Sequence, residues 1–433
     1  MKTDILIIGG GITGLSCAYY LKKDYDILEK ESVPGGVCQT DKIRGFLFDR
    51  AEHFIRIPNE RVLSFFRKIL GNSLFSQKLI SSIYYDKRFV PYPFQKNIYY
   101  LSDKHKLGCL KSFLRRKKYA NNKKVLSLGS WALSTYGDWM SDTFIVPYNK
   151  KIWQTSPFKM RSDFSFDPRI IPEISLDEML ECIFLEEDQR RQSNSQLRYY
   201  LREGGIGSFS DKLASRTRNI KFNKKVISID LKKKRAVCSD GTVCSYNKLI
   251  STMPLPELAK ITKGMPTSLK NKAGLLKYNS ICVFNFALNR NIKLPQHWIY
   301  FPEPEAPFAR VYFLKNFNSK MCPKNKSSIS VIYVFMPDKK IDFSKLEKNI
   351  VEYLIKHNFL FANDIKFKYR QIIKYGMPIP IMGSDKIVEK LDRFLSANSV
   401  KTLGRYGLWK YEGIEHAVEY GQNIDSILKG VRS

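Results

Sequence analysis

The chain has 433 residues, of which 43% are hydrophobic, and a formal net charge of +32. This length provides for two or three domains with a substantial core, and the composition is that of an ordinary globular protein. The charge is compatible with an anionic membrane, with a phosphorylated substrate or simply with a solvated lysine-rich surface. The basic runs at 115–118 and 232–235 lack the interleaved aromatic residues that stack on bases, so we expect no nucleic-acid partner.

The first predicted elements are a strand and a helix in the stretch DILIIGGGITGLSCAYYL, which begins at Asp4. Residues 5–21 carry no charge, but three consecutive glycines interrupt them. A strand followed by a tight turn therefore fits better than a signal sequence or a membrane anchor. No other segment has the length and the apolar character of a membrane span.

The turn after this strand has the GxGxxG spacing, with Gly9, Gly11 and Gly14. The first glycine makes the turn, the second lets the backbone approach a pyrophosphate, and the third packs the helix on the strand. The N-terminus of the helix then presents N–H groups and a positive dipole end to the phosphates. A second strand ends at Glu29, where a carboxylate can bind ribose hydroxyls. The sequence therefore predicts a dinucleotide site.

The residues after Glu29 read KESVPGGVCQT and then GFLFDRAEHF. This order of an acid, two glycines, Thr40 and an aromatic-Asp-x-x-x-His stretch resembles the FAD-binding family of amine oxidases, protoporphyrinogen oxidases and UDP-galactopyranose mutases. The resemblance implies FAD as the cofactor, with Lys30, Gly35 and Gly36 among the residues that bind it.

Residues 76–199 show helical periodicity and several aromatic residues. We expect one buried helical stripe here, formed by Trp131, Leu133, Trp139, Met140 and Phe144.

Residues 226–258 read as strands that form a hairpin around Asp240 and Gly241 and lead into an apolar strand. In the resembled family the backbone near Val226 meets the adenine, although a plain β-meander explains the pattern equally well. Farther on, the segments NSICVFNFAL, HWIYF, FARVYFL and SSISVIYVFM are rich in β-branched and aromatic residues and predict a sheet that forms the floor of a substrate cavity.

These elements predict an α/β fold with a discontinuous Rossmann-type FAD-binding domain, an inserted helical domain and an antiparallel β-sheet substrate domain. The expected bounds are 1–75, 200–265 and 385–433 for the FAD-binding domain, 76–199 for the helical domain and 266–384 for the sheet domain.

Several short motifs resemble the mutases within this family. FIVPYNKKIW is similar to their Pro-Tyr-Asn or Tyr-Thr pair before Lys-x-Trp, which implies a substrate wall of Tyr148, Asn149 and Trp153. LREGGIGSFSDKLA resembles their glycine-rich turn. EAPFARVYF resembles the strand of a substrate-phosphate arginine, here Arg310, and DPRIIPEI resembles the position of its counterpart, Arg169.

The stretch GRYGLWKY near the end of the chain matches the mutase pattern Gly-Arg-x-Gly-x-x-x-Tyr. The resemblance implies that Gly404 and Arg405 lie against the flavin and that Tyr411 contacts the diphosphate. Independently, N–H groups of Gly413 and Ile414 at the start of the last helix would stabilise negative charge on the flavin.

The remaining expected site residues match the mutases less closely. His53 matches a histidine near the flavin, although a hydrogen-bonded structural imidazole is an alternative. Tyr375 keeps one of two tyrosines usual in mutases, and Met377 replaces the next aromatic residue. The stretch around Arg169 matches poorly, so Arg161 or Arg202 can serve instead.

The eight cysteines show no CxxC pair and no close histidine partner, which argues against a zinc site and a disulfide framework. We expect a reducing compartment, a cytoplasmic protein and no bound metal.

The mutase resemblance implies that reduced FAD attacks the anomeric carbon of a nucleoside-diphosphate sugar, the diphosphate leaves, and the sugar recloses with the other ring size. An external reductant such as NAD(P)H and a role in polysaccharide biosynthesis follow from this reading. The alternative is an oxidoreductase of the amine oxidase or protoporphyrinogen oxidase type. A third reading is an FAD-binding scaffold that docks on an anionic membrane. The sugar, the nucleotide and the oligomeric state stay open.

Overall fold

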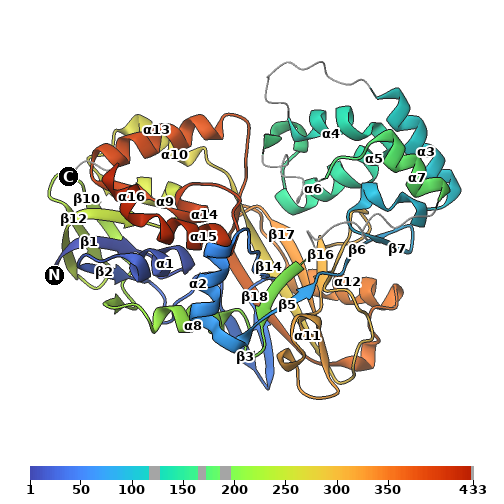
Figure 1. Cartoon of the computed structure of the whole chain (residues 1–433), viewed down its shortest axis with the longest axis horizontal. Helices are drawn as coiled ribbons and strands as arrows, with labels where there is room; N and C mark the ends of the chain where they lie inside the picture. The colour runs from blue at the N-terminus through green and yellow to red at the C-terminus, as the bar shows by residue number, and fades with distance from the viewer. Residues whose placement is uncertain (117–126, 164–171, 186–196, 431–433) are drawn as a thin grey trace. The chain divides into compact units, whose positions relative to one another are not determined.

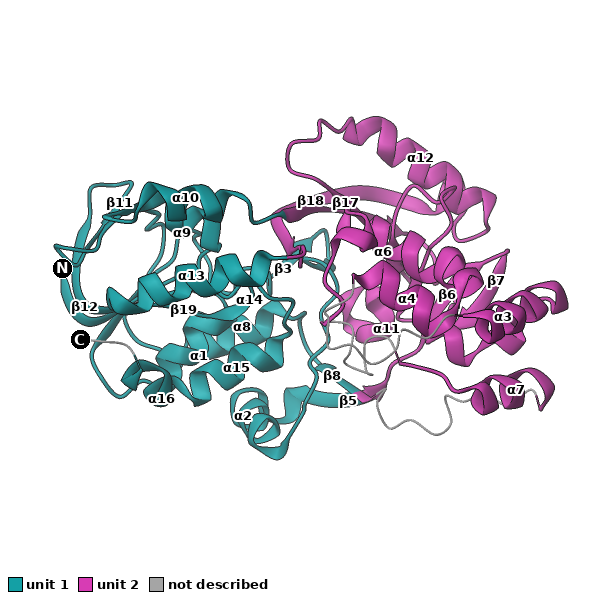
Figure 2. Cartoon of the chain, turned by 90° about the horizontal axis from the view of Figure 1, so that it is seen from above, with its two compact units in different colours: residues 1–76, 198–277, 383–433 teal, residues 77–197, 278–382 magenta. Residues whose placement is uncertain are grey.

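The computed structural model describes residues 1–116, 127–163, 172–185 and 197–430. The chain divides into two compact units, coloured separately in Figure 2. Unit 1 comprises residues 1–76, 198–277 and 383–433, and unit 2 comprises residues 77–197 and 278–382.

Unit 1 is built on an eight-stranded sheet in the order β13-β10-β11-β12-β1-β2-β9, with β19 paired to β12. Its strands are β1 (Lys2–Ile8), β2 (Tyr25–Leu28), β9 (Ile220–Lys221), β10 (Val226–Asp230), β11 (Arg235–Cys238), β12 (Val243–Ser251), β13 (Thr262–Lys263) and β19 (Val400–Thr402). Strands β2, β1, β12 and β19 run parallel, as Figure 1 shows for the first three, whereas β10, β11 and β12 form an antiparallel meander. The apolar run Ile5–Ile8 of β1 is buried, as expected of a parallel strand covered on both faces.

The helices of unit 1 are α1 (Ile12–Tyr20), α2 (Glu60–Leu70), α8 (Gly207–Ala214), α9 (Leu255–Ile261), α10 (Thr267–Gly274), α13 (Ser384–Ala397), α14 (Gly404–Gly407), α15 (Ile414–Gln422) and α16 (Ile424–Lys429). A hairpin of β3 (Thr40–Ile43) and β4 (Phe46–Asp49) lies outside the main sheet. Helices α1 and α15, which come from opposite ends of the sequence, pack together. Helix α15 therefore lies against the helix that follows the first glycine-rich turn, and it is not the last helix as expected, because α16 follows it.

Unit 2 contains a seven-stranded sheet in the order β18-β14-β17-β16-β15-β6-β7. Its strands are β6 (Ser81–Tyr85), β7 (Arg88–Pro91), β14 (Tyr278–Leu288), β15 (Trp298–Tyr300), β16 (Arg310–Tyr312), β17 (Ser327–Phe335) and β18 (Ile365–Pro378). Neighbouring strands in this sheet run antiparallel, except that β15 runs parallel to β6. The stretches of the sequence analysis with the strongest strand pattern thus become β14, β15, β16 and β17.

The helices of unit 2 are α3 (Asp103–Arg115), α4 (Leu128–Tyr136), α5 (Asp138–Met140), the π-helical turn η4 (Ser141–Ile145), α6 (Val146–Trp153), α7 (Leu176–Phe184), α11 (Leu314–Phe317) and α12 (Phe343–Lys356). Strands β5 (Leu74–Lys78) and β8 (Leu197–Leu201) pair with each other where the chain passes from one unit to the other.

Two features of unit 2 differ from the sequence-based expectations. The helical and sheet segments form one compact unit, because β6 and β7 from the first segment extend the sheet of the second. The expected single stripe at 131–144 is broken into α4, α5 and η4, because Gly137 between the helices has φ +82°. Trp131, Met140 and Phe144 are nevertheless buried.

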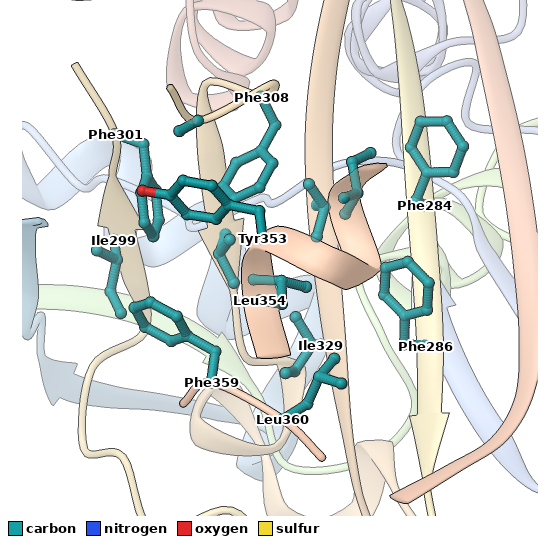
Figure 3. Packing of buried hydrophobic residues seen from close by; sticks show 14 of the residues in the cluster. Phe284, Phe286, Ile299, Phe301, Phe308, Ile329, Tyr353, Leu354, Phe359 and Leu360 are labelled. Atoms are coloured by element: carbon teal, nitrogen blue, oxygen red, sulfur yellow. The ribbon is translucent and has the colours of Figure 1, made fainter. Parts of the chain in front are cut away.

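The core of unit 2 lies between the sheet and α12. Ring and aliphatic side chains gather there in Figure 3, and their members include Phe284, Phe286, Ile299, Phe301, Phe308, Ile329, Tyr353, Leu354, Phe359 and Leu360. Tyr353 lies 5.3 Å from Phe308 between ring centroids. The loop that contains Phe301 and Phe308 is thereby attached to the core.

Candidate functional site

The glycine-rich turn of unit 1 has the geometry that a dinucleotide site needs. Gly9 follows β1 with φ +107°, a conformation that non-glycine residues rarely adopt. A Cβ atom on Gly14 would collide with the carbonyl oxygen of Gly9, so only glycine lets α1 start this close to the turn. Beside Gly11 a Cβ atom would meet only the Gly35 carbonyl oxygen, at 4.0 Å. The turn thus leaves room for a pyrophosphate at Gly11.

Glu29 lies at the end of β2 and is 5% exposed. One carboxylate oxygen, Oε2, accepts the Gly10 N–H at 2.6 Å, and the other, Oε1, accepts the Glu31 N–H at 2.8 Å. These contacts fix the carboxylate beside the glycine-rich turn. Each oxygen keeps a further lone pair with which to accept a ribose hydroxyl.

The second pair of glycines lies against the first turn. Gly35 donates its N–H to the Gly10 carbonyl at 2.8 Å, and Gly35 forms a parallel bridge with Gly11. Lys30 is different: its ammonium forms an exposed ion pair with Glu31 at 3.3 Å. The structure therefore brings Gly35 and Gly36 to the turn, whereas the Lys30 side chain contacts an exposed carboxylate.

The start of β10 is attached to the end of β2. Lys224 donates its backbone N–H to the Glu29 carbonyl at 2.8 Å, two residues before Val226. Val226 is buried and opens β10. This attachment brings the backbone near Val226 close to Glu29, the residue expected to bind the ribose, as the expected adenine contact would require.

The motif near the end of the chain lies against α1. The backbone of Gly404 packs on the side chain of Thr13, in the first turn of α1. The Arg405 guanidinium donates from Nε and Nη2 to the carbonyl of Glu412, and it lies 5.3 Å from the centre of the Tyr411 ring. Arg405 and Tyr411, which we expected to serve flavin and substrate, thus form one cluster in unit 1.

Helix α15 starts at Ile414 with Gly413 as its N-cap residue. The Gly413 N–H donates to Nδ1 of His416 at 3.1 Å. This bond competes with the expected donation from Gly413 to the flavin. The expected donation from Ile414, the first residue of the helix, does not face this competition.

His53 is half-buried and its Nδ1 lies 3.2 Å from the carbonyl oxygen of Ala51. Burial, and secondarily the nearby Arg405 charge, lower the pKa of His53 to about 4. The imidazole is therefore neutral at pH 7, and the structure brings it into the electrostatic range of Arg405.

Unit 2 holds the candidate phosphate-binding arginine. Arg310, the first residue of β16, donates to the Tyr148 hydroxyl from Nη2 at 2.9 Å and from Nε at 3.3 Å. The guanidinium also lies 4.8 Å from the ring centre of Tyr300 and 5.7 Å from that of Trp298. Two aromatic rings and a hydroxyl therefore contact the guanidinium.

The other expected substrate residues of unit 2 have different surroundings. On α6, Trp153 donates from Nε1 to Asn149 Oδ1 at 3.1 Å, and Asn149 donates to the Ile145 carbonyl at 2.7 Å. Both are buried and brace the helix. Tyr375 lies on β18, with its ring 4.3 Å from that of Tyr278. Since two strands separate β18 from β16, Tyr375 is about 14 Å or more from Arg310 across the sheet.

Arg169 lies outside the described residues. Of the two alternatives, Arg161 belongs to unit 2 and forms an ion pair with Asp163. Arg202 belongs to unit 1, where its guanidinium lies 5.2 Å from the centre of the Phe75 ring.

Sequence reasoning missed a buried network around Asp49, at the end of β4. Its carboxylate accepts from the Thr40 hydroxyl at 2.6 Å, the Tyr200 hydroxyl at 2.5 Å and the Ile206 N–H at 3.1 Å. These bonds attach the glycine-rich turn before α8 to the β3–β4 hairpin. Asp49 is the aspartate of the aromatic-Asp-x-x-x-His stretch. That pattern singled out the residue, but it did not indicate that Thr40, Tyr200 and Ile206 are its hydrogen-bond partners.

Among the described residues, no group of three or more His, Cys, Asp or Glu side chains could hold a metal ion. Within the same part of the chain, no helix has both the length and the apolar character required to cross a bilayer.

Comparison with known proteins identifies the family. The model for the flavin containing amine oxidoreductases matches residues 12–357, and the chain belongs to this family. The protein is a flavin-dependent enzyme of this superfamily, and its cofactor is FAD. The glycine turns and Glu29 fit this cofactor, because they combine an open approach for a pyrophosphate with a fixed carboxylate.

Three solved structures are similar over nearly the whole chain. A reduced UDP-galactopyranose mutase is 25% identical with a TM-score of 0.92, covering 99% of this chain and 94% of that one. A protein from Exiguobacterium sp. 255-15, assigned by its description as a protoporphyrinogen oxidase, is 16% identical with a TM-score of 0.77 and 99% of each chain covered. A fatty acid isomerase from P. acnes is 12% identical with a TM-score of 0.66 and 98% of each chain covered. The last two establish the fold alone.

Proposed function

We propose that the protein is a flavin-dependent mutase that interconverts the pyranose and furanose forms of a nucleoside-diphosphate sugar. The similarity to UDP-galactopyranose mutase over 99% of the chain supports this proposal. The observation that carries it is the Arg310 guanidinium, held by the Tyr148 hydroxyl and two aromatic rings as a fixed cation. Such a cation suits a diphosphate, which leaves the sugar and must return to it.

The charge of each side chain suggests its role in this reaction. Arg310 would bind phosphate oxygens and stabilise the charge that develops as the diphosphate leaves. Tyr148 orients the guanidinium. His53 is neutral and Arg405 is cationic, so their cluster would favour negative charge on a neighbouring group. Bound FAD, reduced by an external donor such as NAD(P)H, would supply the nucleophile.

A second candidate is an oxidoreductase that transfers hydride from an organic substrate to FAD. The match to the model of the flavin containing amine oxidoreductases favours it. This candidate needs no diphosphate partner, so it gives Arg310 and Tyr148 no role in binding a charged leaving group.

One experiment separates the two candidates. Dithionite-reduced protein is incubated anaerobically with a panel of UDP-, GDP- and dTDP-sugars, and the sugar ring size is followed by chromatography. Cyanoborohydride is added to parallel samples, and the flavin is weighed by mass spectrometry. We expect one sugar to change ring size and to leave a flavin product heavier by one sugar. No conversion with any donor, together with flavin reduction by an amine or a porphyrinogen, would establish the oxidoreductase instead.

A further inference from the structure

A half-buried lysine on α6 holds a loop of the sheet of unit 2. Lys151 directs its ammonium at four backbone carbonyl oxygens, at distances from 2.5 to 3.2 Å, and these belong to Phe301, Glu303, Ala306 and Phe308. All four lie in the 301–309 loop, which connects β15 to β16. One side chain thus binds most of the length of this loop.

The loop needs such a donor because much of it is buried. Phe301, Ala306, Phe308 and Ala309 are each 2% exposed or less. A buried loop leaves carbonyl groups without water, and each of these requires a hydrogen-bond donor. Figure 3 shows Phe301 and Phe308 directed at Tyr353 on α12, so the hydrophobic core holds the loop from one direction. The Lys151 ammonium supplies the polar anchor.

The same helix also holds the arginine that follows the loop. Lys151 binds the loop, and Tyr148, three residues earlier on α6, accepts from the guanidinium of Arg310. Arg310 is the residue directly after the loop. Tyr148 and Lys151 lie about one turn apart on α6, which follows the π-helical turn η4. Helix α6 therefore contacts both the loop that leads to Arg310 and the guanidinium of Arg310.

We propose that Lys151 is a positioning residue for the diphosphate-binding arginine: its ammonium fixes the 301–309 loop and thereby sets the place of Arg310 relative to Tyr148. This inference rests on the proposed function, because it takes Arg310 as the residue that binds the diphosphate. Lys151 itself acts through the loop and does not contact the substrate.

The charge of Lys151 gives this arrangement a dependence on pH. Burial lowers the pKa of Lys151 to about 8, while the charges of Glu305 and Glu303, the acidic groups that face it, act in the opposite direction. A neutral amine has two N–H donors and a lone pair, which is repelled by the surrounding carbonyl oxygens. Diphosphate affinity of the wild type should therefore fall about tenfold between pH 7 and pH 9.

The first test needs no ligand. Hydrogen–deuterium exchange is measured for holoenzyme of the wild type, of Lys151→Met and of the control Lys150→Met, whose side chain is exposed on the same helix. We expect amides of residues 301–310 to exchange about tenfold faster in Lys151→Met and to stay unchanged in the control. Unchanged exchange in Lys151→Met would overturn the inference.

The second test separates positioning from general damage. The nucleoside diphosphate that the wild type binds best among UDP, GDP, dTDP and ADP is titrated into each variant. Lys151→Met should weaken binding about tenfold with the flavin spectrum unchanged, and Lys151→Arg should recover most of the affinity and lose the decline between pH 7 and pH 9. Should Lys151→Met fail to fold, the pH series of the wild type and of Lys151→Arg decides alone.

The outcomes distinguish this inference from the proposed function. If Arg310→Ala weakens binding and Lys151→Met does not, or if the wild type and Lys151→Arg share the same pH profile, the inference is wrong and the proposed function stands. If Arg310→Ala binds every diphosphate as well as the wild type, the proposed function fails, and the role of Lys151 in substrate binding fails with it.

Discussion

At the scale of single residues, backbone groups and hydroxyls hold the charges of the candidate site. Glu29 accepts two backbone N–H groups, the Lys151 ammonium lies within hydrogen-bond distance of four carbonyl oxygens, and Arg310 donates to the Tyr148 hydroxyl. Because the backbone partners of Glu29 and Lys151 carry no full charge, these two residues keep their charges for a ligand and for a loop. Substitution of such a residue removes a charge-assisted hydrogen bond. It also leaves the donor or acceptor that was its partner without a hydrogen bond.

Glu29→Gln should weaken FAD binding by about 2 kcal/mol, because the amide has one acceptor oxygen and would turn an NH₂ group toward a backbone N–H. Flavin content per polypeptide and the dissociation constant of FAD measure the effect. Glu31→Gln is the matched control, since Glu31 contributes its backbone N–H and not its side chain. Equal flavin retention in both variants would contradict the role assigned to Glu29.

Arg310→Ala should weaken the binding of a nucleoside diphosphate by about 2 kcal/mol, the scale of a lost charge-assisted hydrogen bond. Arg310→Lys should lie between, because a lysine keeps the charge but not the planar fork that Tyr148 holds. Isothermal titration calorimetry measures both, and the flavin spectrum should stay that of the wild type. Identical affinities in all three proteins would remove Arg310 from the site.

The burial of His297 leads us to predict that the free energy of unfolding falls in acid. It is 4% exposed, its Nδ1 accepts the Ile80 N–H at 3.0 Å, and its Nε2 lies 3.1 Å from Gln77 Oε1. Burial lowers the pKa of His297 from 6.5 to about 4. The unfolded chain therefore binds more protons between these values, and the contribution of His297 is present above pH 6.5 and lost as the pH falls toward 4.

The expected loss from His297 is up to about 3 kcal/mol in the free energy of unfolding. Denaturant unfolding at pH 7, 5.5 and 4.5 measures it. His297→Asn, whose Oδ1 can accept the Ile80 N–H in place of Nδ1, should be less stable at pH 7 but should show a shallower decline in acid. A decline as steep as that of the wild type would assign the acid sensitivity to other groups.

At the scale of elements, strands with a strong local pattern were predictable. The β-branched and aromatic runs predicted for the substrate sheet are β14, β15, β16 and β17, and the hairpin around Asp240 and Gly241 joins β11 to β12. Helical periodicity was less decisive at 131–144, since Gly137 ends one helix and begins the next. Periodicity reports which side chains are apolar, but a single backbone angle decides whether one helix continues.

The packing of helix α12 on the sheet of unit 2 should contribute to the free energy of unfolding. Leu354 is fully buried between this helix and the sheet, so Leu354→Ala should lower the free energy of unfolding by about 2–5 kcal/mol through lost burial and a residual cavity. Chemical denaturation of the holoenzyme measures the change. Glu352→Ala, on the solvent side of the same helix, should change stability by less than about 0.5 kcal/mol. A small effect of Leu354→Ala would show that the core can close around the missing side chain.

At the scale of the whole molecule, the net charge of +32 is the largest feature that the candidate site does not explain. We predict weak association with anionic liposomes at low salt, through many solvated lysine and arginine side chains, and its loss at about 0.5 M salt, where the Debye length is only a few ångströms. Co-sedimentation measures binding, with neutral liposomes as the control. If the same amount of protein stays in the supernatant with anionic and with neutral liposomes at every salt concentration, the protein does not bind anionic membranes and the charge only serves a solvated surface.

The sequence by itself determined the family and the cofactor turn, because the glycine spacing, the acid at the end of β2 and the glycine pair that follows are local requirements of a backbone that must approach a pyrophosphate. It also placed Arg310 on a strand. Only the tertiary structure decided that Tyr148 meets Arg310 and that Lys151 holds the loop before it. These contacts depend on which side chains of α6 the packing of unit 2 brings within hydrogen-bond distance of the 301–310 segment. The sequence order does not contain those distances, since they arise when segments far apart in the chain are buried together.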